Sequence, residues 1–314
     1  MSQIPQSEID SVIRAIRSNP QYLDPDYVIG AYRACGLDVI PDPFAEDVSA
    51  RVRRALTERR PLSVIRIGDG EANLMTYGYY ADTGNLDRYV IEAAMAMQED
   101  AIIVDECWNV VLRDLMMGAV AQADIIGVVG LWRSGRPTAE RFIERFLSDL
   151  RGFSGHWRAI DYLLNLARRG FLGNKTIASA HLYFSVLEYL DTILPLAERI
   201  LVISSRDGIV GKLRKRHPDL HFDYVAVANS RAASGALLGK PTFLSTVFSA
   251  LPQDMRGCLC LIGAGIWAEL YCTWIRQRGG VALDIGSGCD LLDGDSIRPI
   301  HRTIQQERLQ KYRL

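Results

Sequence analysis

Short apolar runs rich in β-branched residues alternate with helical patterns along most of the chain, and this alternation predicts an α/β fold. The chain has 314 residues, 48% of them hydrophobic, which is enough to bury a substantial core. Strand, loop and helix repeated over this length are typical of a mainly parallel sheet flanked by helices. We therefore predict a Rossmann-like domain that carries an N-terminal helical subdomain.

The first sixty residues predict helices rather than strands. Ser7 and Asp10 resemble a capping box ahead of an amphipathic run, so the first helix begins there. A second helix is expected over residues 26–35 and a third over residues 45–59. The third is rich in arginine, and we interpret its charges as a solvated face.

The sheet is expected from residue 62 onward. Its predicted strands cover residues 62–67, 101–105, 125–131, 176–180, 200–204, 222–227, 258–262 and 281–285. The helices predicted among them cover residues 71–77, 138–150, 182–189, 208–216 and 266–278. Because no convincing linker interrupts the pattern, we expect one Rossmann-like domain (61–300) that carries a helical subdomain (1–60) and is followed by a basic C-terminal tail (301–314).

The composition excludes several classes of protein. Lys and Arg (36) nearly balance Asp and Glu (37), so the chain has no net positive charge that would favour binding to nucleic acid. The six cysteines form no CxxC pair, which argues against structural zinc, and a reducing compartment is expected. No apolar run approaches the ~20 residues of a membrane span, and the N-terminus lacks the apolar stretch of a signal peptide. We expect a cytoplasmic protein.

The sequence Arg-Ile-Gly-Asp-Gly-Glu holds the residues best suited to binding a metal or a phosphate. It comes directly after an apolar run that predicts a buried strand. Asp69 and Glu71 supply the hard oxygen ligands that Mg²⁺ or Mn²⁺ prefers. Gly68 and Gly70 let the backbone approach a ligand closely, and Arg66 is suited to pairing with phosphate. This segment predicts a metal–diphosphate site; the alternative is an ordinary Asp-Gly turn with a helix cap.

Two glycine-rich segments offer competing interpretations. Gly263 and Gly265 follow a predicted strand and open a helix, as in a dinucleotide-binding fingerprint. The acidic residue expected about 20 residues later is not cleanly placed, because Asp284 falls inside the next predicted strand. An NAD(P)-binding oxidoreductase therefore stays an alternative. Gly286 and Gly288 resemble a methyltransferase loop, but too few residues follow them to complete such a domain.

Taken together, these segments resemble the GT-D fold glycosyltransferases, bacterial enzymes that build surface polysaccharides and glycoproteins. The matching blocks are residues 66–71, 261–265 and 279–287. The resemblance implies transfer of a sugar from a nucleotide-diphosphate donor, such as a UDP-sugar, to a surface-glycan, lipid-linked or glycoprotein acceptor. It also implies that the Asp-x-Glu motif, at Asp69 and Glu71, binds the Mn²⁺ or Mg²⁺ that holds the donor diphosphate. A non-catalytic nucleotide-sugar-binding module is the remaining alternative.

Further candidates lie at other predicted strand ends, where active-site loops gather in such sheets. His181 and Asp284 are candidates for the base that activates the acceptor, although a structural role for His181 stays open. Arg206 is a candidate phosphate clamp. The residues that we expect to bind the donor are Arg66, Gly68, Gly70, Arg206, Gly263 and Gly265.

The basic tail carries three apolar residues among its charges: Ile304, Leu309 and Tyr312. A helix with such a composition is either solvated or docks on an anionic membrane surface. Docking would give peripheral contact with the inner membrane face, where lipid-linked acceptors are found.

Overall fold

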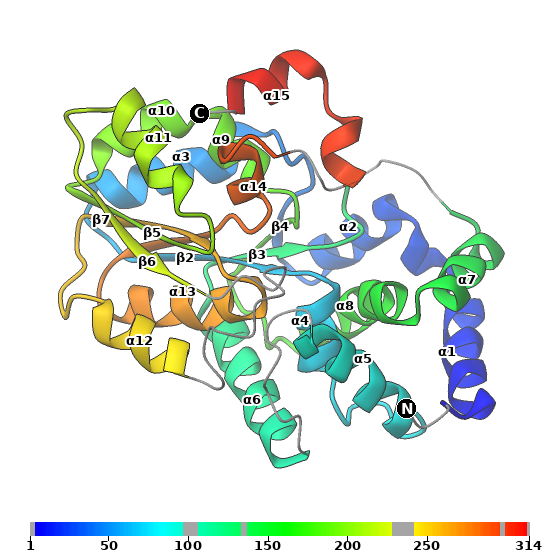
Figure 1. Cartoon of the computed structure of the whole chain (residues 1–314). Coiled ribbons are helices and arrows are strands. Elements are labelled where there is room, and N and C mark those ends of the chain that lie inside the picture. Colours follow the sequence, from blue (N-terminus) through cyan, green and yellow to red (C-terminus); the bar gives the residue numbers. More distant parts are fainter. Residues whose placement is uncertain (1–3, 97–105, 133–136, 228–241, 296–298, 313–314) are drawn as a thin grey trace. The chain divides into compact units, whose positions relative to one another are not determined.

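The computed structural model of the chain describes residues 4–96, 106–132, 137–227, 242–295 and 299–312 (Figure 1). Within these residues, eight parallel strands form one sheet in the order β1-β4-β3-β2-β8-β7-β5-β6. The strands are β1 (Asp38–Ile40), β2 (Leu62–Ile67), β3 (Ile125–Val128), β4 (Thr176–Ser179), β5 (Arg199–Ser204), β6 (Phe222–Ala226), β7 (Cys258–Gly263) and β8 (Val281–Asp284). Helices flank the sheet, so the predicted α/β, Rossmann-like class is confirmed.

Helices occupy most of the chain outside the strands. The α-helices are α1 (Gln6–Ser18), α2 (Pro25–Ala34), α3 (Glu46–Thr57), α4 (Asp69–Met75), α5 (Gly84–Ala96), α6 (Glu106–Gln122), α7 (Ala139–Ser148), α8 (Leu150–Arg168), α9 (Tyr183–Glu188), α10 (Leu190–Ile193), α11 (Gly208–Arg216), α12 (Thr242–Ala250), α13 (Ala268–Gln277), α14 (Gly288–Leu292) and α15 (Gln306–Tyr312). Short 3₁₀ segments are η1 (Pro20–Leu23), η2 (Leu194–Leu196), η3 (Gly265–Trp267) and η4 (Pro299–Thr303).

The sequence-based prediction located seven of these strands and missed two kinds of element. It missed the three-residue β1, and it missed helices α5, α6, α8, α10, α12 and α14. The predicted helix over 138–150 instead ends at Ser148, because the Asp149 carboxylate accepts the N–H of Gly152 and starts a new helix, α8. The predicted strand over 101–105 lies outside the described residues.

The described residues form two compact units, each built from segments far apart in the chain. Unit 1 combines residues of the segments 1–42, 66–121 and 125–181. Unit 2 combines residues of the segments 43–65, 122–124 and 182–314. The division at residues 60 and 300 that the sequence suggested stays a prediction.

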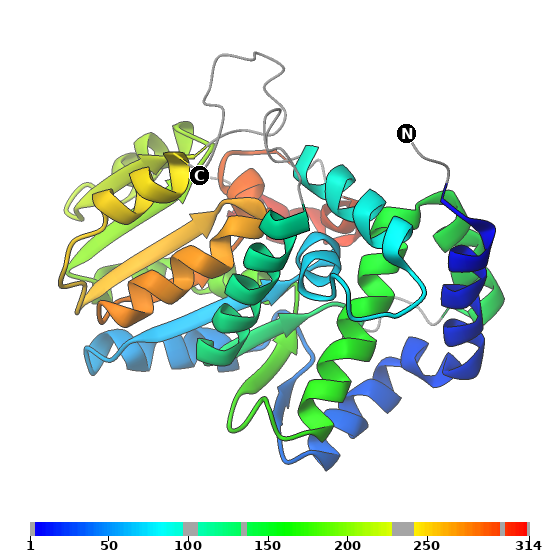
Figure 2. The ribbon, with the colours of Figure 1, turned by 90° about the horizontal axis from the view of Figure 1, so that it is seen from below.

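In unit 1, strand β4 pairs with both β1 and β3, and its residue Thr176 lies in register with Asp38 and Ile125. The long helix α8 packs along the short helix α4, and α1 lies beside α7 (Figures 1 and 2). Helix α8 buries a stripe of apolar side chains at helical spacing, which includes Ile160 and Leu164. This packing fixes the start of α4, directly after β2.

In unit 2, β5 pairs with β6 on one side and with β7 on the other, and β8 pairs with β7 and β2. Helices α12 and α13 cover one face of these strands, and α3, α10 and α11 cover the other (Figures 1 and 2). Strands covered on both faces are expected to be continuously apolar, and β5 is buried from Ile200 to Ser204.

The basic tail belongs to the core of unit 2. Its apolar residues Leu309 and Tyr312 are buried, and the Tyr312 hydroxyl donates a hydrogen bond to the Glu188 carboxylate at 2.9 Å. These side chains pack inside the unit, so they do not form the apolar face that membrane docking would require. Within the described part of the chain, no helix combines the length and apolar character needed to cross a bilayer.

Candidate functional site

The predicted Asp-x-Glu motif forms the first turn of α4, directly after β2. Gly68 is the residue before the helix, and its backbone N–H donates to Oε2 of Glu71 at 3.0 Å. A Cβ on Gly68 would stand 2.7 Å from that oxygen, so a side chain at position 68 would displace the carboxylate. Glu71 therefore caps the helix through one oxygen. A helix-cap role is thus present, but it belongs to Glu71; Asp69, which the Asp-Gly turn interpretation made the cap, is the first residue of α4.

Asp69, the first residue of α4, points its carboxylate toward solvent and toward a cation of α8. Its side chain is 44% exposed, and Oδ2 lies 3.7 Å from Nη2 of Arg151. Gly70, between the two acids, is buried. The two acids of the motif therefore differ in role: Glu71 stabilises the turn, and Asp69 presents an accessible carboxylate.

Arg66, near the end of β2, reaches toward the end of β4. Its Nη1 lies 3.4 Å from the carbonyl oxygen of Ala180, the residue before His181. His181 donates its backbone N–H to Oγ of Ser179 at 3.2 Å, and its ring meets Trp132 edge-to-face at 5.6 Å. Unit 1 thus brings a cation, an imidazole and an indole to the carboxyl ends of β2, β3 and β4.

Helix α8 supplies residues that the sequence reasoning missed. The Arg151 carbonyl oxygen accepts a hydrogen bond from Nδ2 of the buried Asn73 of α4 at 3.0 Å. Gly155 lies so close to α4 that a Cβ there would stand 2.1 Å from the carbonyl oxygen of Asp69. The backbone of α8 is therefore held against the turn that carries the Asp-x-Glu motif.

His156 follows Gly155 on the same helix. Its ring packs edge-to-face on Phe142 at 5.7 Å and lies beside Gly130, just after β3. Burial lowers the pKa of His156 to about 4, so its imidazole is neutral at physiological pH. The apolar residues of α8 recur at helical spacing, and this pattern could have located these residues. Gly152 and Gly155 interrupt the pattern.

The two carboxylates fit a hard divalent cation that takes its other ligands from elsewhere. Mg²⁺ and Mn²⁺ accept carboxylate oxygens, retain several waters and bind phosphate oxygens of a substrate. The accessible Asp69 suits such a site, whereas Glu71 already uses one oxygen on Gly68. Among the described residues, no group of three or more His, Cys, Asp or Glu side chains forms a metal-binding cluster. The donor set therefore fits an open site completed by water and diphosphate, not an all-protein cage.

The glycines predicted to bind the donor in unit 2 are needed for packing. A Cβ on Gly263, at the end of β7, would stand 2.5 Å from Sγ of Cys289 and 3.1 Å from the carbonyl oxygen of Gly286. Gly265 has φ +56°, a left-handed conformation that favours glycine, and it starts η3. Both glycines thus have a structural explanation within unit 2.

The two charged candidates of unit 2 are engaged inside it. Arg206, after β5, pairs with Asp290 at 2.9 Å and with Asp295 at 3.2 Å. Asp284 is the last residue of β8, so it stands at the end of the strand and not inside it as predicted, and its side chain is only 2% exposed. The candidates thus fall into two groups, one around the Asp-x-Glu motif in unit 1 and one at the ends of β5, β7 and β8 in unit 2.

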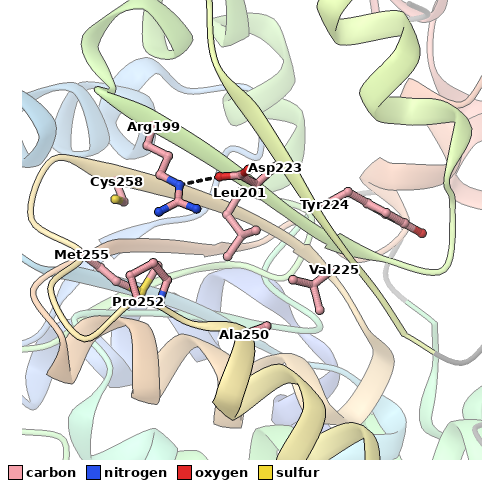
Figure 3. Close-up of a pocket in the computed structure, with 9 residues that line it drawn as sticks. All are labelled: Arg199, Leu201, Asp223, Tyr224, Val225, Ala250, Pro252, Met255 and Cys258. Atoms are coloured by element: carbon pink, nitrogen blue, oxygen red, sulfur yellow. Dashed lines mark hydrogen bonds and ion pairs between the residues drawn. The ribbon is translucent and has the colours of Figure 1, made fainter.

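A separate cavity of about 210 Å³ opens in unit 2, at the ends where β5 and β7 begin (Figure 3). Arg199 and Asp223 form an ion pair at its wall, and Leu201, Met255 and Pro252 give it an apolar lining. None of the predicted site residues lines this cavity. It therefore contributes nothing to the Asp-x-Glu site.

Comparison with known families supports the resemblance drawn from the motifs. Residues 44–152 match a family model described as a GT-D fold-like domain. The match contains the whole Asp-x-Glu motif and ends just after Arg151. This part of the chain therefore carries a GT-D-like domain, a glycosyltransferase-like fold, which confirms the predicted resemblance for the block at residues 66–71; the blocks at residues 261–265 and 279–287 lie outside the match. No curated protein and no solved structure matches the chain significantly.

Proposed function

We propose that this protein is a metal-dependent glycosyltransferase that moves a sugar from a nucleotide-diphosphate sugar to a glycan, lipid-linked or glycoprotein acceptor. The GT-D-like match over residues 44–152 supports the general class. The observation that carries the proposal is the accessible carboxylate of Asp69, two residues before Glu71, in the turn directly after β2. In parallel α/β sheets, ligands bind beyond the carboxyl ends of the strands, which is where this turn lies.

The proposed reaction breaks the bond between the sugar and the nucleoside diphosphate and forms a bond from the sugar to an acceptor hydroxyl, whose proton passes to a base. Negative charge grows on the nucleoside diphosphate as the sugar leaves, and a divalent cation held by Asp69 and Glu71 would neutralise that charge. Arg66 lies at the same strand end and would add a second positive charge. Trp132, beside His181, offers an aromatic face suited to stacking on a sugar or a base. His181 and Asp284 stay the candidates for the base.

Two conservative variants test the motif without removing the helix cap. In Glu71→Gln the amide oxygen still accepts the Gly68 N–H, because Gln serves at this position of a capping box. Glu71→Gln and Asp69→Asn should therefore fold normally but lose Mn²⁺-dependent hydrolysis or transfer of the nucleotide sugar. Glu140→Gln and Asp114→Asn, at exposed surface pairs, are the matched controls and should keep full activity. Full activity of both Asp69→Asn and Glu71→Gln would refute the proposal.

A ligand screen distinguishes the proposed function from its alternatives. Thermal unfolding is followed with UDP, GDP, dTDP and NAD(H), each with and without Mn²⁺. We expect one nucleoside diphosphate to raise the melting temperature only when Mn²⁺ is present. Stabilisation by NAD(H) alone would instead favour an oxidoreductase, and binding of a nucleotide sugar without turnover would favour a non-catalytic module.

The dinucleotide alternative rests on the glycine segment after β7. In that fingerprint the first glycine makes the tight turn, and the packing of Gly263 on Cys289 and the Gly286 carbonyl fits this role. The second glycine opens the helix N-terminus to the pyrophosphate, whereas Gly265 starts the 3₁₀ turn η3 ahead of α13. Because the GT-D-like match covers the Asp-x-Glu motif, we favour the glycosyltransferase.

A further inference from the structure

Arg151 and Asp69 form an ion pair that is too long for a hydrogen bond. The nearest atoms are 3.7 Å apart, and both side chains reach solvent, Arg151 at 25% and Asp69 at 44% exposure. Exposed pairs of this kind contribute little to stability. The pair is therefore poorly explained as a structural contact.

The backbone around this pair, by contrast, is tightly held. The Arg151 carbonyl oxygen accepts the Asn73 side-chain amide at 3.0 Å, and Gly155 packs directly on the Asp69 backbone. Because the Cα positions are fixed on both helices, a change at the pair involves only the guanidinium and the long flexible side chain that carries it. Arg151 is thus a cation anchored beside the solvent-accessible carboxylate of Asp69.

A divalent cation and a guanidinium compete for the same carboxylate. A metal ion bound to Asp69 would repel a positive charge at the distance of Arg151. A diphosphate brought in with the metal carries negative oxygens, which a planar guanidinium binds through two parallel hydrogen bonds. Arg151 then gains a new partner at the moment when it loses Asp69.

We propose that Arg151 is a donor-binding residue that holds the Asp69 carboxylate before the metal binds and turns to the donor diphosphate afterwards. The inference rests on the proposed function, because it assigns a role toward the same metal and donor. It predicts two effects of opposite sign. Removing the charge of Arg151 should strengthen binding of the metal alone and weaken binding of the diphosphate.

The test measures binding by isothermal titration calorimetry and needs no catalytic turnover. Mn²⁺ alone is titrated into wild type and Arg151→Gln, and we expect the variant to bind it several-fold more tightly. The protein saturated with Mn²⁺ is then titrated with whichever of UDP, GDP and dTDP stabilises the wild type most. We expect Arg151→Gln to bind this nucleotide at least tenfold more weakly than wild type. Arg151→Lys keeps the positive charge but lacks the planar guanidinium, so its affinity should lie between those of wild type and Arg151→Gln.

Arg145→Gln is the matched control, because it removes the same charge from an exposed position of α7. It should leave both affinities unchanged. If wild type binds Mn²⁺ and nucleotide but Arg151→Gln binds either one as wild type does, the role of Arg151 is overturned and the proposed function stands. If wild type binds neither, the proposed function fails, and the role of Arg151 fails with it.

Discussion

Gly155 of α8 lies directly against the carbonyl oxygen of Asp69, where a Cβ would stand 2.1 Å from that oxygen. No real Cβ approaches a backbone oxygen so closely, so glycine at position 155 permits α8 to touch the turn of the Asp-x-Glu motif. Asn73 and Arg151 join the same two helices by a hydrogen bond nearby. The accessible carboxylate of the motif is therefore positioned by a helix far away in the sequence.

This contact predicts that Gly155→Ala is destabilising and displaces Asp69. In an open helix position, replacing glycine by alanine gains about 0.5–1 kcal/mol. Here overpacking against backbone should outweigh that gain, with a net loss of about 1–3 kcal/mol. Urea unfolding measures the loss, and calorimetry should show weaker Mn²⁺ binding in the variant.

Gly30→Ala provides the matched control in α2 of the same unit. A Cβ at position 30 would meet no atom within 4 Å, so this variant should be slightly more stable than wild type. If Gly155→Ala and Gly30→Ala stabilised the protein equally, α8 would not be in close contact with the turn of the motif.

A buried ion pair gives a second prediction for unit 1. Nη2 of Arg158 donates to Oδ1 of Asp87 at 2.6 Å, and both side chains are at most 2% exposed. Asp87 also accepts the Thr83 hydroxyl and the Gly78 N–H. Arg158→Met should cost about 3–5 kcal/mol of unfolding free energy, because it leaves the Asp87 charge buried without its cation.

Denaturant unfolding of Arg17→Met supplies the comparison. Arg17 pairs with Glu140, but both side chains are more than half exposed, so we expect no measurable loss of stability. If Arg158→Met unfolded at the same urea concentration as Arg17→Met, the buried pair would not stabilise unit 1.

The strands were the most predictable part of the fold, for a physical reason. Buried parallel strands such as β5 and β7 are continuous apolar runs, and such runs stand out in the sequence. Helix α8 was missed because Gly152 and Gly155 are typical of turns. Each has a local explanation: Gly152 lies at the Asp149 cap, and Gly155 touches Asp69.

Only the part of the site that consists of consecutive residues could be predicted from the sequence. The Asp-x-Glu turn and its two alternatives, metal ligand and helix cap, follow from six consecutive residues. The contacts of Asp69 with Arg151 and Gly155 come from tertiary packing of α4 on α8, which residue spacing does not encode. In unit 2, Gly263 satisfied a ligand-binding pattern, but its surroundings explain it by packing against Cys289.

The neutral imidazole of His156 gives a prediction about acid stability. Burial lowers the pKa of His156 to about 4, whereas a histidine in the unfolded chain has a pKa of about 6.5. Between these values the unfolded state binds more protons than the folded state, so stability should fall as the pH drops from about 6.5 toward 4. Because the residue is only partly buried by surface area, we expect a contribution of about 1–2 kcal/mol.

Urea midpoints of wild type and His156→Gln at pH 4.5, 5.5 and 7 measure this contribution. Glutamine does not titrate, so the variant should lose less stability than wild type on acidification, while its stability at pH 7 changes little. Identical pH dependence of His156→Gln and wild type would mean that His156 does not oppose protonation in the folded protein.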